Sequence, residues 1–180
     1  FTLAREQYRR VQLLLERGEP VTLALALSTR EDQADTIGVN VVADLVGSDP
    51  ALRDQVVIIG GHFDSWHAAG GATDNAAGSA VAMEAMRILA SIGVKPRRTI
   101  RVALWDGEEQ EDYIGSSGYV RKHFADVVTM RLRPDHSKVS AYFNVDGGTG
   151  RIRGWNLQGN AAARPILAQL LAPWADLGAS

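Results

Sequence analysis

The stretch that decides the fold runs Val56-Val57-Ile58-Ile59-Gly60-Gly61-His62-Phe63-Asp64-Ser65, and Gly71-Ala72-Thr73-Asp74-Asn75-Ala76-Ala77-Gly78 follows shortly after it. The four apolar residues at its start are typical of a buried strand. Glycines, one histidine and two aspartates then follow at the carboxyl end of that strand. In open α/β sheets, sites form beyond the carboxyl ends of the strands, so this stretch predicts both a strand and a site.

The rest of the chain alternates between strand patterns and helix patterns. Apolar runs predict strands at Val56–Ile59, Thr99–Trp105 and Val139–Val145. Helical spacing of apolar residues predicts helices over about 76–91, 116–126 and 162–172. Such alternation implies an α/β fold of three layers, with helices on both faces of a mostly parallel sheet.

The N-terminal part is predicted to add one helix and two strands. A helix is expected over about residues 2–18, since Gly18 and Pro20 close a run with helical spacing. Val21–Ser28 alternates between apolar and smaller or polar residues, and Gly38–Val46 follows a polar turn. We expect these two strands to pair antiparallel at a sheet edge. No interdomain linker is visible, so residues 1–180 are expected to form a single domain.

Composition excludes several classes of protein. The 180 residues are 46% hydrophobic and carry a net charge of −2, which gives no electrostatic footprint for nucleic acid. No apolar stretch approaches the ~20 residues of a membrane helix. The sequence contains no cysteine, which excludes disulfides and thiolate metal sites.

Further acids follow the later predicted strands. Glu108 and Glu109 come after Thr99–Trp105, and Asp146 ends the apolar run at Val139–Val145. The carboxyl ends of parallel strands meet at one edge of a sheet, so we expect these acids to lie near His62. One histidine with several carboxylates makes a hard nitrogen and oxygen site that suits zinc.

Two acids are expected to have roles other than binding metal. Asp64, two residues after His62, has a spacing at which it can accept the free ring N–H and fix the histidine tautomer. One of the adjacent pair Glu108 and Glu109 can bind metal while the other faces the reacting water as a general base.

Each candidate can also be a purely structural residue. His62 can be a hydrogen-bonded loop histidine, Asp74 an N-cap and Asp146 a turn residue before two glycines. The acids between Asp106 and Asp112 can form a solvated turn. Their placement at the ends of parallel strands favours a site.

Four motifs, in this order, resemble those of the co-catalytic zinc aminopeptidases, most closely the carboxypeptidase Q-like (plasma glutamate carboxypeptidase-like) branch of that family. They are Gly61-His62-Phe63-Asp64-Ser65-Trp66, Gly71-Ala72-Thr73-Asp74-Asn75-Ala76-Ala77-Gly78, Trp105-Asp106-Gly107-Glu108-Glu109-Gln110 and Asn144-Val145-Asp146-Gly147-Gly148-Thr149-Gly150. The resemblance covers nearly the whole chain. The chain departs from the family at Gly147, where an amide side chain is expected.

The resemblance implies a site with two zinc ions. His62, Asp74 and Asp146 would hold one ion, and Asp74 would bridge to a second ion held by Glu109 and a later histidine. Glu108 would be the general base. The peptide bond between Asp74 and Asn75 would be cis.

The resemblance also implies a function. The protein would be a secreted or periplasmic exopeptidase of the aminopeptidase or dipeptidase type, and its substrate would be a peptide or dipeptide. Two alternatives stay open: an acyl transfer like that of the related glutaminyl cyclases, and a non-catalytic domain of receptor type on the same scaffold. Substrate preference and oligomeric state also stay open.

The second histidine that the family requires is missing from this sequence. It is expected after Asp146, but the last histidine of the chain is His136. The sequence starts with Phe1 and ends at Leu177-Gly178-Ala179-Ser180. Two explanations are open, namely that the second metal site has been lost or that the chain is a fragment. We favour the second and expect a truncated zinc-peptidase catalytic domain whose second metal site is incomplete and which can be inactive by itself.

Overall fold

The protein is described by a computed structural model covering residues 3–28, 30, 37–110 and 113–179. It divides into two compact parts, Phe1–Thr36 and Ile37–Ser180. The sheet, and all six residues predicted to form the site, belong to the second part. That residues 1–180 make a single domain stays a prediction.

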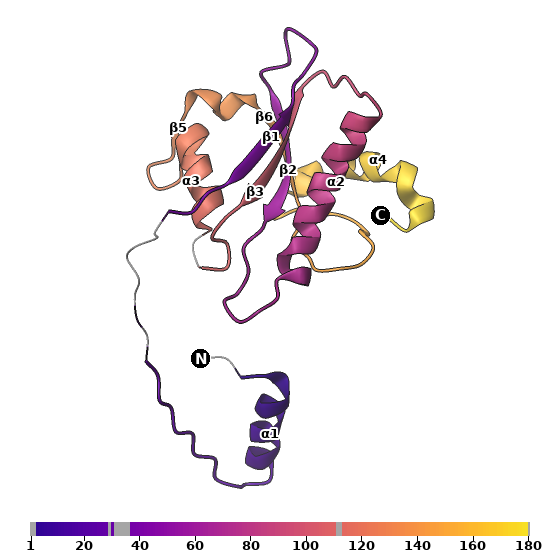
Figure 1. The fold of residues 1–180 in the computed structure, drawn as a ribbon. Helices are drawn as coiled ribbons and strands as arrows, with labels where there is room; N and C mark the ends of the chain where they lie inside the picture. Colours follow the sequence, from indigo (N-terminus) through magenta and orange to yellow (C-terminus); the bar gives the residue numbers. More distant parts are fainter. Residues whose placement is uncertain (1–2, 29, 31–36, 111–112, 180) are drawn as a thin grey trace. The chain divides into compact units, whose positions relative to one another are not determined.

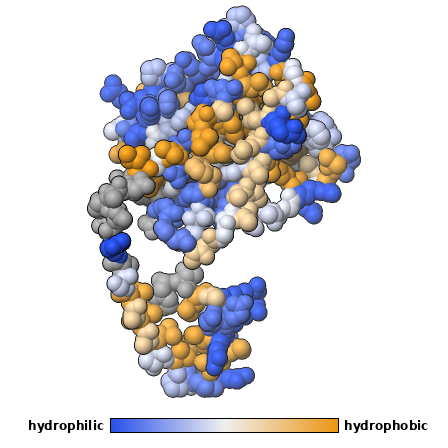
Figure 2. Space-filling view, viewed as in Figure 1, coloured by the Kyte–Doolittle hydropathy of each residue, from blue (hydrophilic) through white to orange (hydrophobic). Residues whose placement is uncertain are grey.

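The first part contains one helix, α1 (Arg5–Glu16), which confirms the helix predicted over residues 2–18. It ends where Gly18 adopts the left-handed conformation (φ 73°), which glycine adopts without steric cost. Apolar side chains run along one side of α1 and along the extended chain after it (Figure 2). Leu15 and Leu25 are both more than half exposed.

The second part is built on a four-stranded sheet with the order β1-β3-β2-β6 (Figure 1). Its strands are β1 (Val41–Leu45), β2 (Val56–His62), β3 (Thr99–Trp105) and β6 (Val139–Asn144). β2 is parallel to both β3 and β6, whereas the edge strand β1 runs antiparallel to β3. The predicted α/β fold with a mostly parallel sheet is confirmed.

The predicted pairing of the two N-terminal strands is wrong. Residues 21–28 form no strand, and β1 pairs with β3 instead. The register places Asp44 opposite Arg101, and the Arg101 guanidinium binds the Asp44 carboxylate with N–O distances of 2.6 and 2.7 Å. This two-bond ion pair favours β3 as the partner of the edge strand.

Helices complete the fold around the sheet. They are α2 (Ala77–Ser91), α3 (Ile114–His123) and α4 (Arg164–Leu171). A small ribbon of β4 (Ala125–Asp126) and β5 (Arg131–Leu132) follows α3. Short helical turns occupy Ala72–Ala76, Pro134–Lys138, Ala161–Ala163 and Ala172–Leu177. None of the helices within the described ranges is long and apolar enough to cross a membrane.

The core has two halves, one on each face of the sheet. Val102 and Leu104 of β3 pack with Ala82 of α2 on one face. Ala103 and Trp105 point the other way because side chains alternate along a strand, and they pack with residues of β2 and α3. Helices therefore cover both faces, which confirms the predicted three layers (Figure 1).

β2 extends three residues beyond its predicted end at Ile59. A Cβ at Gly60 would lie 2.0 Å from the carbonyl oxygen of Ala103, and a Cβ at Gly61 would lie 2.6 Å from that of Val145. Only glycine allows this close approach of neighbouring strands. The two glycines therefore carry the strand on to His62, its last residue.

Candidate metal centre

His62 lies at the centre of the predicted site and is only 3% exposed. Its Nδ1 atom is 3.1 Å from the backbone carbonyl oxygen of Asp64. A carbonyl oxygen can only accept, so Nδ1 carries the proton and Nε2 of the neutral ring keeps its lone pair. The tautomer leaves Nε2 as the atom that can bind a metal.

Asp74 and Asp146 converge on that nitrogen. Their Oδ1 atoms lie 3.0 and 3.3 Å from Nε2 of His62. The donor atoms of these three side chains all lie within 4.8 Å of one another. The chain thus brings together the three residues that the resemblance assigns to one ion.

Asp74 sits in the helical turn Ala72–Ala76 that leads from the loop after β2 into α2. Its backbone is not helical (φ −120°, ψ 96°), and the peptide bond between Asp74 and Asn75 is cis, as the resemblance implied. The Asp74 side chain is 60% exposed and that of Asp146 is 36% exposed. Both carboxylates can therefore be reached from solvent.

Asp64 holds the turn that carries the two glutamates. Its two carboxylate oxygens accept the backbone N–H groups of Glu108 and Glu109, at 3.1 and 3.0 Å. The Asp64 carboxylate is also 3.4 Å from Nδ1 of His62, but the carbonyl oxygen of the same residue is closer. Burial alone would raise the pKa of Asp64, and the two N–H donors lower it overall.

Glu108 and Glu109 lie beside the histidine. Oε2 of Glu108 is 3.9 Å from Nε2 of His62, and donor atoms of His62, Glu108 and Glu109 form a second group within 4.8 Å. Burial is the largest cause that raises the pKa of both glutamates, and the charges of neighbouring acids add to it, while the charge of His62 acts against them. A raised pKa makes each a stronger proton acceptor.

One oxygen of Glu109 marks a place for a cation. Oε1 of Glu109 is buried and, among the described residues, has no hydrogen-bond partner. A buried carboxylate oxygen without a partner is costly, and a bound cation would remove that cost. The donors here are imidazole nitrogen and carboxylate oxygen, which suit zinc. The residues present therefore fit the metal.

The charges of the site also indicate that it binds a cation. Five carboxylates surround one imidazole, namely those of Asp64, Asp74, Glu108, Glu109 and Asp146. None of them pairs with a lysine or arginine within the part of the chain that is described. Burial lowers the pKa of His62, but the charges of Asp146, Glu108 and Asp64 outweigh it and the pKa is raised. The excess negative charge favours a bound cation.

Asn75 is a functional residue that reasoning from the sequence missed. It is 1% exposed, and its amide nitrogen donates to the carbonyl oxygens of His62 (3.2 Å) and Val145 (2.8 Å). Its Oδ1 atom accepts the N–H of Gly78 in α2. One side chain thus ties together β2, the segment after β6 and the start of α2. Its only sequence signal is its position next to Asp74.

The chain matches the family described as Peptidase family M28 over residues 40–173, which include all six predicted site residues. The chain belongs to peptidase family M28. It is 31% identical over 158 residues to carboxypeptidase Q of Rattus norvegicus, a match that covers 88% of this chain and 31% of that protein. This M28 chain therefore spans less than a third of that relative's length.

Several solved structures resemble this M28 chain, including the following two. One is the peptidase M28 precursor from Shewanella amazonensis SB2B, with a TM-score of 0.56 and 30% identity, covering 73% of this chain and 28% of that one. The other is the aminopeptidase from Aneurinibacillus sp. strain AM-1, with a TM-score of 0.50 and 27% identity, covering 64% and 26%. The resemblance found in the sequence is thus confirmed at the level of the family.

Proposed function

We propose that the protein is a zinc-dependent exopeptidase of the aminopeptidase or dipeptidase type, acting on a peptide or dipeptide. The observation that carries this proposal is the convergence of Asp74 and Asp146 on Nε2 of His62, beside a buried oxygen of Glu109 that lacks a partner among the described residues. Membership of peptidase family M28 supports the same chemistry.

In this proposal His62, Asp74 and Asp146 hold one zinc ion. Asp74 has two carboxylate oxygens, so it would also contribute to a second site with Glu109, together with a histidine that this sequence does not contain. When bound, zinc supplies Lewis acidity, which activates water and stabilises negative charge on the oxygen of the scissile carbonyl group. The carbonyl oxygen of Asp64 accepts the Nδ1 proton of His62 and so fixes the tautomer in which Nε2 can bind a metal.

Glu108 is the general base of the proposed reaction. It takes a proton from the attacking water and returns it to the nitrogen of the leaving amine, so one water is consumed for each peptide bond that is broken. Its raised pKa suits a group that must first accept and then release a proton. Asp64 positions Glu108 through the backbone, because it accepts the Glu108 N–H.

The wider setting is also a proposal. Residues 1–180 would belong to a single catalytic domain, and the protein would act in a secreted or periplasmic location, as the family resemblance implies. Fractionation of expressing cells tests the location, since a secreted or periplasmic protein leaves the cytoplasmic fraction.

The function is tested by comparing two neighbouring glutamates on the intact protein. Glu108→Gln keeps the size of the side chain but cannot accept a proton, so turnover should fall by about 10²–10⁴ while zinc stays bound. Glu109→Gln should instead reduce the zinc content, and Asp74→Ala should remove most of it. Elemental analysis after dialysis measures the metal, and release of free amino acids measures turnover.

Four results would contradict the proposal. Full zinc content in Asp74→Ala would exclude the bridging role, and loss of metal in Glu108→Gln with retention in Glu109→Gln would reverse the two assignments. Release of ammonia in place of an amino acid would indicate glutaminyl cyclase chemistry. A wild-type protein that binds no zinc would indicate a non-catalytic domain.

A further inference from the structure

A pocket lies at the other end of the sheet from the metal centre. Its volume is about 500 Å³, within the range of small-molecule sites. Val56 and Thr99, which line it, are the first residues of β2 and β3, whereas His62 is the last residue of β2. A strand rises about 3.3 Å per residue, so the length of β2 separates the two sites by ~20 Å.

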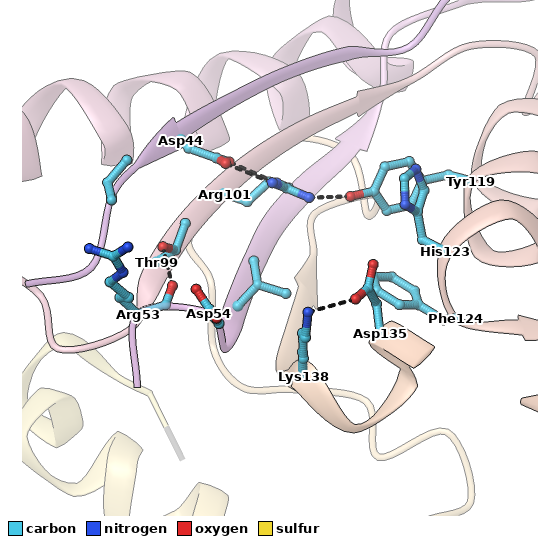
Figure 3. A pocket seen from close by; sticks show the side chains of 12 residues that line it. Asp44, Arg53, Asp54, Thr99, Arg101, Tyr119, His123, Phe124, Asp135 and Lys138 are labelled. Carbon is cyan, nitrogen blue, oxygen red and sulfur yellow. Dashed lines mark hydrogen bonds and ion pairs between the residues drawn. The ribbon is translucent and has the colours of Figure 1, made fainter. Parts of the chain in front are cut away.

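Two ion pairs form opposite walls of this pocket (Figure 3). On one wall Arg101 binds Asp44 through two nitrogens and also donates to the hydroxyl of Tyr119. On the other wall Lys138 pairs with Asp135 at 2.8 Å. The Tyr119 hydroxyl accepts from Arg101, so its own proton remains available to a ligand.

Asp54 is a charged group in the pocket without such a partner. Its side chain forms no hydrogen bond or ion pair with any described residue, and it comes from the segment before β2 (Figure 3). The pKa of Lys138 is raised first by its hydrogen bond with Asp135, and the charge of Asp54 adds to this effect. Asp54 therefore interacts electrostatically with Lys138 across the pocket, although the two side chains form no ion pair.

The surface between these charges is partly apolar. Val56 is a core residue that lines the pocket, and Tyr119 and Phe124 pack against the same core cluster while lining it as well. A ligand placed here would meet a carboxylate on one side, an ammonium group on the other and a hydrocarbon surface between them.

We propose that this pocket binds a free, zwitterionic amino acid with an apolar side chain. The ligand's ammonium group pairs with Asp54, its carboxylate pairs with Lys138, and its side chain packs on Val56 and Phe124. A molecule with both charges fits better than a simple cation, because Asp54 attracts its ammonium group while Lys138, which has three N–H donors and is paired only with Asp135, can also donate to its carboxylate. The binding does not depend on the proposed peptidase reaction.

The ligand side of the test uses three probes on the intact protein. L-Leucine carries both charges, leucinamide lacks the carboxylate, and N-acetyl-leucine lacks the ammonium group. Isothermal titration calorimetry should show saturable binding of L-leucine, with each derivative about tenfold weaker because one charged hydrogen bond is lost.

The protein side of the test uses one variant for each charge. The Asp54→Asn variant should bind leucine about tenfold more weakly than the wild-type protein does. It should also bind leucine and N-acetyl-leucine equally well. The Lys138→Gln variant should likewise bind leucine and leucinamide equally well. Both side chains are exposed, so the variants should melt at the wild-type temperature.

Two further variants distinguish binding in this pocket from binding at the metal centre or elsewhere on the surface. Glu84→Gln removes an exposed ion pair with Arg87 on α2 and should leave leucine binding unchanged. Glu109→Gln alters the metal centre and should also leave it unchanged. Absence of leucine binding at ~10 mM would overturn the proposal. So would binding that Glu109→Gln abolishes and Asp54→Asn does not affect, because leucine would then occupy the metal centre alone.

Discussion

At the scale of single residues, the metal centre depends on groups that position the ligands as much as on the ligands. The carbonyl oxygen of Asp64 accepts the ring N–H of His62, and its two carboxylate oxygens accept the backbone N–H groups of Glu108 and Glu109. One residue therefore connects the end of β2 to the turn after β3. Partners of this kind orient the ligands and tune their basicity.

Replacing Asp64 by asparagine tests this role. An amide has one acceptor oxygen in place of two, so one N–H of the glutamate turn loses its partner. We expect zinc affinity and kcat/KM to fall by roughly 10–100-fold. Zinc titration and steady-state kinetics measure the two effects.

The control for this variant is Asp49→Asn. Asp49 also accepts a backbone N–H, that of Ala51, but it pairs with Arg97 on the surface near the other end of the sheet. Both zinc affinity and kcat/KM should stay at wild-type values. Equal losses in the two variants would indicate a general effect on folding and would contradict the positioning role of Asp64.

Asn75 provides the second prediction at this scale. Asn75→Ala removes partners from the carbonyl oxygen of Val145 and the N–H of Gly78, while Ser79 still donates to the carbonyl oxygen of His62 at 2.8 Å. One buried and one partly buried backbone group are left unsatisfied, so unfolding free energy should fall by ~2–4 kcal/mol. Urea denaturation measures it. Asn156→Ala, which removes an exposed turn bond, should cost less than ~1 kcal/mol.

At the scale of the elements, the strands of the sheet could be predicted, but one of the two predicted N-terminal strands and its pairing could not. The apolar runs at Val56 and Thr99 indicate strands because buried strands need continuous apolar side chains. The alternation over residues 21–28 looked equally strand-like, yet these residues form no strand, because alternation alone does not supply a partner strand. The choice of β3 as the partner of β1 depends on the register that places Asp44 opposite Arg101.

The end of β2 was predicted too early for a related reason. Gly60 and Gly61 suggest a turn when only the sequence is known. In the fold they are strand residues whose missing side chains admit the backbone carbonyl oxygens of Ala103 and Val145. Tertiary contact, which no local pattern contains, decides between a turn and a strand.

Two glycines in helices should respond to alanine in opposite ways. A Cβ at Gly78 in α2 would lie 2.3 Å from both Oδ1 of Asn75 and the carbonyl oxygen of Val145, so Gly78→Ala should cost ~1–3 kcal/mol and weaken zinc binding. A Cβ at Gly118 in α3 meets nothing within 4 Å, so Gly118→Ala should stabilise by about 0.5–1 kcal/mol. Chemical denaturation measures both changes. Destabilisation by Gly118→Ala would contradict the open space around it.

At the scale of the whole molecule, the sequence predicted the fold class and brought the six site residues to one edge of the sheet. His62, Glu108 and Asp146 lie far apart in the sequence, but each follows or ends a parallel strand. Their meeting follows from topology alone. The pocket beside Lys138 was not foreseen, because its lining comes from β1, α3 and the turn Pro134–Lys138, which share no sequence signal.

The division into two compact parts leads to the last prediction. Both core clusters, the four-stranded sheet and every proposed metal ligand lie in Ile37–Ser180. A part with its own core and sheet can fold alone. We therefore expect a protein without residues 1–36 to keep its strand and helix content and to bind zinc as tightly as the 180-residue chain.

Far-ultraviolet circular dichroism and zinc titration of the two proteins, side by side, measure this. The shortened protein should show the strand and helix content of residues 37–180, and its zinc affinity should lie within about twofold of that of the 180-residue chain. This result would indicate that α1 and the chain after it contribute nothing to the site. A shortened protein that is unfolded or has lost zinc would contradict this expectation. It would favour the single domain over residues 1–180.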